Sequence, residues 1–155
     1  MKRRVAPLVL AAVLLAGTGT AAAAPPEPID VTFIWPCSGF NATLTATGKS
    51  ATISLPGDRF KIIAPDQKVT ITGKSGETVS YVITGVTHVQ VQPDGSYAVT
   101  ATGLNVVLVP KTKSHPAGLF LTSGTVSWTL NPDGSERTFF SSQGGQVTDV
   151  CALIK

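Results

Sequence analysis

The feature that most restricts the fold of this 155-residue chain is a repeated alternation of apolar and polar residues. A step of two places every apolar side chain on one face of a β-strand. The pattern occurs in residues 29–35, 40–46, 79–83, 97–101 and 126–130. Val, Ile and Thr supply 40 of the 132 residues after position 23, and β-branched side chains favour strands. No window has sustained helical spacing, so we predict an all-β domain.

Glycine-containing turns separate these runs, at residues 48–50, 73–76, 93–95, 132–134 and 144–145. The two Pro-Asp-Gly groups are typical of tight turns, because Pro presets φ and Gly accepts a positive φ. Short turns predict an antiparallel meander of about nine or ten strands. The Thr-Gly pairs ending at Gly48, Gly73, Gly85 and Gly103 are interpreted as strand ends or bulges that let the sheet curl.

A meander of this size must close or stack to hide its edges. We predict an up-and-down or partly open barrel, with a two-sheet β-sandwich as the alternative. The residues expected on the inner wall are Val79, Tyr81, Ile83, Val89, Val91, Val99, Val126, Trp128 and Leu130. Phe33, Trp35, Phe120 and Phe139 or Phe140 are the side chains that could instead fill the interior.

The N-terminus has the layout of a secretory signal peptide. A basic start precedes an apolar run that is too short to span a bilayer, and alanines follow. We predict a signal peptide over residues 1–23, cleavage between Ala23 and Ala24, and a single all-β domain over residues 24–155. Three of the 12 Lys and Arg lie in the signal peptide, so nine remain against nine Asp and Glu.

The near-zero mature charge argues against nucleic acid as a partner. The mature chain has no second apolar stretch long enough for an integral membrane segment. We therefore predict a secreted, extracellular protein, either free in the medium or loosely associated with the cell wall.

The two cysteines of an exported chain predict one disulfide, Cys37–Cys151, closing a loop of about 115 residues. The alternatives are free thiols or a metal site with His88 and His115, which lack ligand spacing. A bridge also predicts a closing seam in which the strand at residues 29–35 lies beside residues 146–154.

No residue set has the pattern of a catalytic site, and we expect no catalytic residues, cofactor or metal. His88 shares its predicted strand face with two glutamines, and His115 lies in a basic loop, so both are expected in solvent. Asp149 alternates with Val147 and Cys151 and could therefore point inward as a hydrogen-bonded structural residue.

Six fragments of the chain carry a resemblance to known proteins: residues 36–40, 55–59, 83–85, 102–105, 117–121 and 147–153. On these the chain resembles a group of small, uncharacterised exported proteins of actinobacteria, over most of the mature length. The resemblance implies an exported all-β protein and brings no catalytic residue or activity with it.

The sequence favours a binding module for a small apolar molecule or a partner protein. In the first case Tyr81 and Trp128 would face the ligand, because they alone bring polar tips to the predicted wall. The alternatives are a wall-associated structural protein or an inhibitor of extracellular enzymes, and an enzyme is least favoured.

Overall fold

The computed structural model describes residues 24–142 and 144–155. The predicted signal peptide and Ala23 lie outside the described residues. Twelve strands and one short helix follow one another: β1 (Glu27–Cys37), β2 (Phe40–Leu55), β3 (Arg59–Ile63), β4 (Lys68–Thr72), β5 (Thr78–Val82), β6 (Val86–Val91), β7 (Tyr97–Thr102), β8 (Asn105–Val109), β9 (Gly118–Ser123), β10 (Thr125–Leu130), β11 (Glu136–Ser142), β12 (Gln146–Asp149) and α1 (Val150–Leu153).

All strand pairs are antiparallel, so the predicted all-β meander is confirmed. Nine strands form one sheet, in which β11-β10-β7-β6-β3-β2-β4-β5 follow in order and β1 also pairs with β2. The other sheet is β12-β9-β8. Over the described residues the sheet does not close into a barrel, and the strands number twelve where about nine or ten were predicted.

The larger strand number has a simple cause, because long strands are interrupted midway. The consecutive strands β3 and β4 both pair with β2, one after the other along its length. In the same way β7 pairs with β10 and β8 pairs with β9, in one unbroken register. The meander therefore consists of seven bent runs: β1, β2, β3–β4, β5–β6, β7–β8, β9–β10 and β11–β12.

Glycines mark the bend in five of these runs, and they form a row across the sheet. The row contains Gly48 within β2, Gly85, Gly103, Gly124 and the pair Gly144–Gly145. A Cβ added to Gly103, whose φ is +73°, would lie 3.0 Å from the Cα of Gly85. A Cβ on Gly48 would collide with the main chain at Asp66. Gly73 and Gly103 directly follow the ends of β4 and β7, and Gly85 lies between β5 and β6, so these three glycines stand at strand ends as predicted. Gly48 lies within β2, where the register shifts by one residue between the partners β3 and β4.

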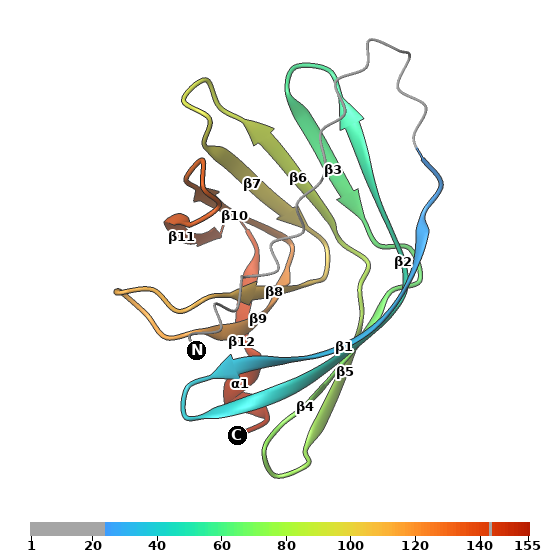
Figure 1. The fold of residues 1–155 in the computed structure, drawn as a ribbon, viewed down its shortest axis with the longest axis vertical. Coiled ribbons are helices and arrows are strands. Elements are labelled where there is room, and N and C mark those ends of the chain that lie inside the picture. Colours follow the sequence, from blue (N-terminus) through green and yellow to red (C-terminus); the bar gives the residue numbers. More distant parts are fainter. Residues whose placement is uncertain (1–23, 143) are drawn as a thin grey trace, which may run out of the picture.

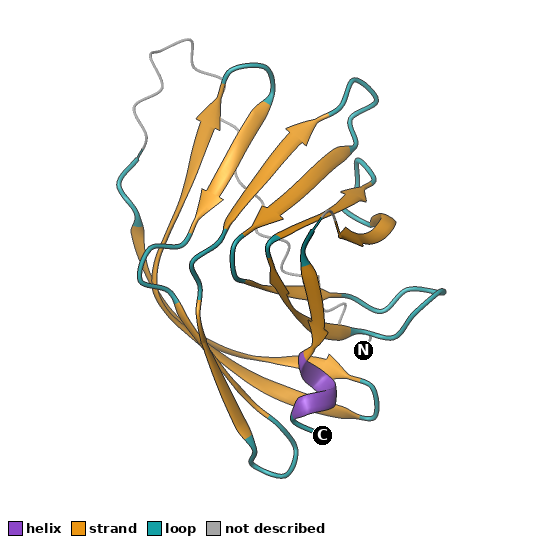
Figure 2. Ribbon diagram, turned by 180° about the vertical axis from the view of Figure 1, so that it is seen from behind, coloured by secondary structure: helices purple, strands orange, loops and turns teal. Residues whose placement is uncertain are grey.

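The bend divides the molecule into two parts (Figures 1 and 2). On one side of the row lies a continuous sheet, called the upper sheet below, which consists of β11, β10, β7, β6, β3 and the end of β2. On the other side the sheet splits between β5 and β8. One flap contains β1, the start of β2, β4 and β5, and the other is the three-stranded sheet. The three-stranded sheet lies between the six upper strands and the β1–β2 hairpin (Figure 1).

The main core lies between the first flap and one face of the three-stranded sheet. Its largest fully buried side chains include Leu44 on β2, Ile71 on β4, Leu119 on β9 and Ile154 after α1. The opposite face of β9 carries Phe120, whose ring centroid lies 5.5 Å from that of Phe140 in an edge-to-face contact. The three-stranded sheet is therefore packed on both faces.

All nine residues predicted to face inward are buried or half-buried. The register places Val89, Val99 and Trp128 side by side on one face of the upper sheet. Of the aromatic side chains proposed to fill the interior, Phe33 and Phe139 are exposed. Strand alternation identified the inner face correctly. It did not show that Phe33 and Phe139 lie on the edge strands β1 and β11, where they are exposed.

Both predicted Pro-Asp-Gly turns are confirmed, and they have the same hydrogen bonds. Asp94 accepts from the amide and hydroxyl of Ser96, and Asp133 does the same with Ser135. Arg137 bonds to Asp94 across the two hairpins at 3.0 Å. The bonds from Ser96, with that from Arg137, lower the pKa of Asp94 to about 2.

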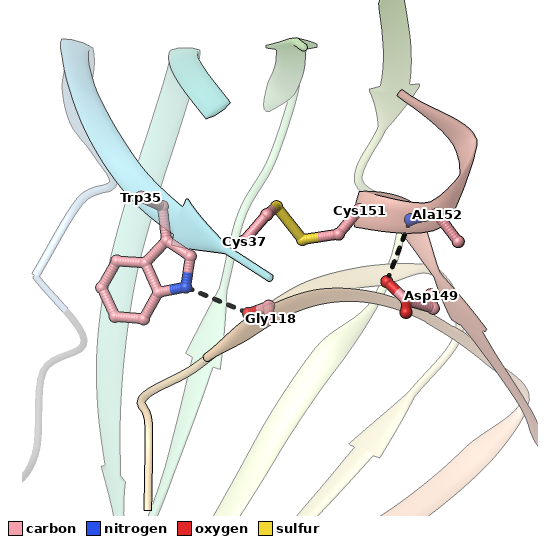
Figure 3. Close-up of a disulfide and its surroundings, with 6 residues drawn as sticks. All are labelled: Trp35, Cys37, Gly118, Asp149, Cys151 and Ala152. Atoms are coloured by element: carbon pink, nitrogen blue, oxygen red, sulfur yellow. Dashed lines mark hydrogen bonds between the residues drawn. A yellow bond between two sulfur atoms is a disulfide. The ribbon is translucent and has the colours of Figure 1, made fainter. Parts of the chain in front are cut away.

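The disulfide Cys37–Cys151 is present, but the predicted seam is wrong. The bridge joins the end of β1 to α1 (Figure 3). β12 instead pairs with β9, and β1 pairs with β2. Trp35 strengthens this junction by donating its Nε1–H to the carbonyl oxygen of Gly118 at 3.0 Å. Asp149 does not point inward. Its exposed carboxylate accepts the amide N–H of Ala152 and caps α1.

Removal of the bridge is expected to destabilise the domain by about 4–5 kcal/mol, because a crosslink over more than 100 residues restricts the unfolded chain. Urea unfolding of the Cys37→Ser/Cys151→Ser variant measures this loss. Alkylation of the unreduced native protein, followed by mass spectrometry, should modify neither cysteine. Two modified thiols would contradict the bridge.

Gly103→Ala is expected to lower the free energy of unfolding by about 1–3 kcal/mol, because a side chain at positive φ is strained. Gly134→Ala is the matched control, since Gly134 has a φ of +79° but no atom within 4 Å of an added Cβ. The loss at Gly103 should be the larger one, measured by thermal or urea unfolding. Equal losses would mean that close approach at the bend contributes nothing.

Candidate functional site

The longest strand at a sheet edge is β1, with 11 residues. It pairs with β2 along its whole length, and within the described part of the chain no strand pairs with its other side. The other edge strands, β5, β8, β11 and β12, have four to seven residues. Short edges are one of the ways in which proteins avoid unwanted pairing, and β1 does not use it.

The β1–β2 hairpin determines which backbone groups of β1 point outward. Its two-residue turn, Ser38–Gly39, makes Cys37 and Phe40 face each other across the ladder. Lys49 of β2 donates its amide N–H to the carbonyl oxygen of Pro65, on the side of β2 away from β1. Its partner Pro28 on β1 is therefore in a non-hydrogen-bonded pair, which agrees with the pattern set by the turn. The odd-numbered residues of β1 therefore bond to β2, and the even-numbered residues present their backbone groups to the free side.

The residues whose backbone groups point to the free side of β1 are Pro28, Asp30, Thr32, Ile34 and Pro36. Proline lacks an N–H and belongs where no ladder bond is needed, so both prolines fit the free side. Between them, three residues offer an unpaired N–H and C=O each. The free edge is thus a short hydrogen-bonding segment with a proline at each end.

The side chains of this edge are unusually apolar for exposed positions. Residues 30–34 are all exposed, including Val31 at 46%, Phe33 at 37% and Ile34 at 66%. Val31 and Phe33 lie on the inner face, opposite Ala46 and Leu44 of β2. The window between the prolines carries a single charge, Asp30. Proline-free, apolar edges of this kind are pairing sites.

The free edge of β1 was not predicted from the sequence, because the predicted seam would have covered β1 with the C-terminal strand. The alternation in residues 29–35 is equally consistent with a covered edge and a free one. The feature of the sequence that does indicate a free edge is the pair of prolines at positions 28 and 36, four residues on either side of Thr32.

A second candidate is a hollow of about 180 Å³ beside the disulfide, which His115, Phe120, Phe139 and Asp149 help to line. His115 is not the exposed residue that was predicted, since its side chain is only 20% exposed. Its Nδ1 lies 2.9 Å from the carbonyl oxygen of Pro116, and its Nε2 lies 2.7 Å from Glu136 Oε2.

Both partners of His115 are acceptors, so both ring nitrogens must donate, and only the protonated ring can do this. The carbonyl of Pro116, and then the carboxylate of Glu136, raise the pKa of His115 against the opposing effect of burial. With both nitrogens engaged, the ring has no free nitrogen to act as a general base. The pair therefore fastens the loop before β9 to β11.

Another hollow, of about 220 Å³, has Leu55, Arg59, His88 and Gln90 in its wall. His88 is exposed, as predicted. Both hollows are smaller than the roughly 300 Å³ at which ligand pockets usually begin. Tyr81 packs against the main core and Trp128 against Phe140, and neither lines either of these two hollows. Their contact with a ligand stays a prediction.

Within residues 24–142 and 144–155, no three His, Cys, Asp or Glu side chains are grouped as metal ligands. The only helix described there has four residues, and none is long and apolar enough to cross a membrane. Comparisons of the chain with protein-family models, with curated proteins and with solved structures found no match.

The ion pair of His115 makes stability dependent on pH. Because the folded-state pKa is raised, its contribution is complete below the unfolded value of about 6.5 and is lost as the pH rises through the folded pKa. The stability difference between the native protein and His115→Gln should therefore shrink with rising pH in urea unfolding. His88→Gln, at an exposed site, is the matched control. A pH-independent difference for His115→Gln would contradict the pair.

Proposed function

We propose that the chain is an exported binding module that takes up an extended protein segment by strand addition at the free edge of β1. The observation that carries this proposal is the outward-facing segment of residues 30–34, which combines unpaired backbone groups with exposed apolar side chains. In strand addition, main-chain hydrogen bonds supply affinity, and alternate side chains supply specificity.

A partner protein is favoured over a small apolar molecule by the sizes of the two hollows. They hold about 180 and 220 Å³, and both are open at the surface rather than enclosed. An enzyme is disfavoured by the histidines, because His115 has both nitrogens bonded and His88 stands exposed. The exposed edge of β1 offers both unpaired backbone groups and apolar side chains for recognition.

Export is supported by the disulfide, which is typical of oxidising compartments outside the cytosol. The bridge fixes the end of β1 to α1, and Trp35 ties the same end to β9. The strand is therefore held at one end by covalent and polar contacts, while its free side is presented without rearrangement. A preorganised edge lowers the ordering cost of binding.

The proposal is tested by panning a displayed library of random heptapeptides on the mature protein, at low surface density. Peptides with alternating β-branched or aromatic residues should be enriched on the native protein. Thr32→Pro should abolish the enrichment, because it removes the central outward N–H and leaves the bonds to β2 in place. Thr32→Val is the matched control and should retain it, since its N–H is intact.

Circular dichroism and the thermal midpoint establish that both variants are folded before panning. Absence of enriched peptides on the folded native protein would refute strand addition. Equal enrichment on Thr32→Pro would place the binding surface elsewhere.

A further inference from the structure

We infer that the strand added to β1 is the β1 strand of a second copy of this chain, paired antiparallel about a two-fold axis at Thr32. This inference rests on the proposed function and names its partner. It is carried by the pattern of backbone groups along the edge, which is symmetric about Thr32: three residues with an outward N–H and C=O lie between two outward prolines.

The backbone groups of β1 are self-complementary about this axis. Antiparallel pairing centred on Thr32 places Asp30 opposite Ile34 of the second copy, and Thr32 opposite its own equivalent. All of these residues point outward, so each opposed pair can exchange two N–H···O bonds. Pro28 then lies opposite Pro36 of the second copy, and the ladder ends where neither chain has an N–H to offer.

The side chains match in the same register. On the inner face, Val31 lies opposite Phe33 of the second copy, and Ile29 lies opposite Trp35. These are non-hydrogen-bonded pairs, in which side chains approach most closely. Val31 and Phe33 are the exposed members of that face, at 46% and 37%, so pairing covers the apolar surface that the fold leaves open.

Charge favours this antiparallel pairing over a parallel pairing of two β1 edges. The acidic residues Glu27 and Asp30 both lie in the first half of β1. In the antiparallel pair the two Asp30 side chains are four residues apart, about 13 Å, which is beyond the screening length of about 8 Å at physiological salt. Parallel in-register pairing of two β1 edges would bring them within about 5 Å of each other.

The two-fold contact is also closed, because it uses the β1 edge of both copies. The paired segment is only nine residues long in each copy, whereas a stable interface needs about 20–30 residues a side. The expected product is therefore a weak, reversible dimer that depends on protein concentration.

Sedimentation of the mature protein over a concentration series should show a shift from monomer to dimer. Thr32→Pro should remain monomeric at every concentration, and Thr32→Val should dimerise like the native protein. A native protein that stays monomeric up to millimolar concentration would overturn the inference. If heptapeptides still bind β1 in that case, strand addition survives with another partner; if they do not, both proposals fail.

The register is tested by a crosslink. Opposed residues of a hydrogen-bonded pair have Cα atoms about 5.5 Å apart, which a disulfide can span. Mild oxidation of Thr32→Cys should therefore give a covalent dimer whose linking peptides both contain position 32. Thr47→Cys is the matched control: Thr47 is exposed on the same outer face, but it lies on β2, away from the edge. Equal crosslinking of both variants would mean random collision and would overturn the inference.

Discussion

The row of glycines across the sheet is the constraint on which the rest of this structure depends. Five of the seven bent runs change direction at a glycine, and at Gly48 and Gly103 an added side chain would come too close to a neighbouring main chain. A strand that bends sharply can send its two halves into different layers. The bend therefore converts a single meander into a wide upper sheet, a flap and a three-stranded sheet packed on both faces.

The disulfide and the free edge are both consequences of this layering. Because β12 follows β9 into the inner layer, it cannot run beside β1, and the first and last strands do not meet. The bridge instead reaches from the end of β1 to α1, across the core. One end of β1 is thereby anchored, and its outer side is left without a strand.

The candidate site owes its character to the same arrangement. In a closed barrel, Val31 and Phe33 would belong to a continuous inner wall. Here they occupy the inner face at the margin of an open flap, where they are exposed. The prolines that border the segment limit how many residues can pair with it, so the edge is suited to a short strand and resists long stacks.

The sequence by itself determined the strands, the Pro-Asp-Gly turns, the inward faces and the cysteine pairing, since these depend on alternation of side chains, on φ preferences and on there being two cysteines. Only the tertiary structure decided that the sheet stays open, that Asp149 caps a helix and that His115 is bonded at both nitrogens. These outcomes depend on which run lies beside which. That choice is made by the packing of Phe120, Leu119 and their neighbours between two layers, and local periodicity carries no record of it.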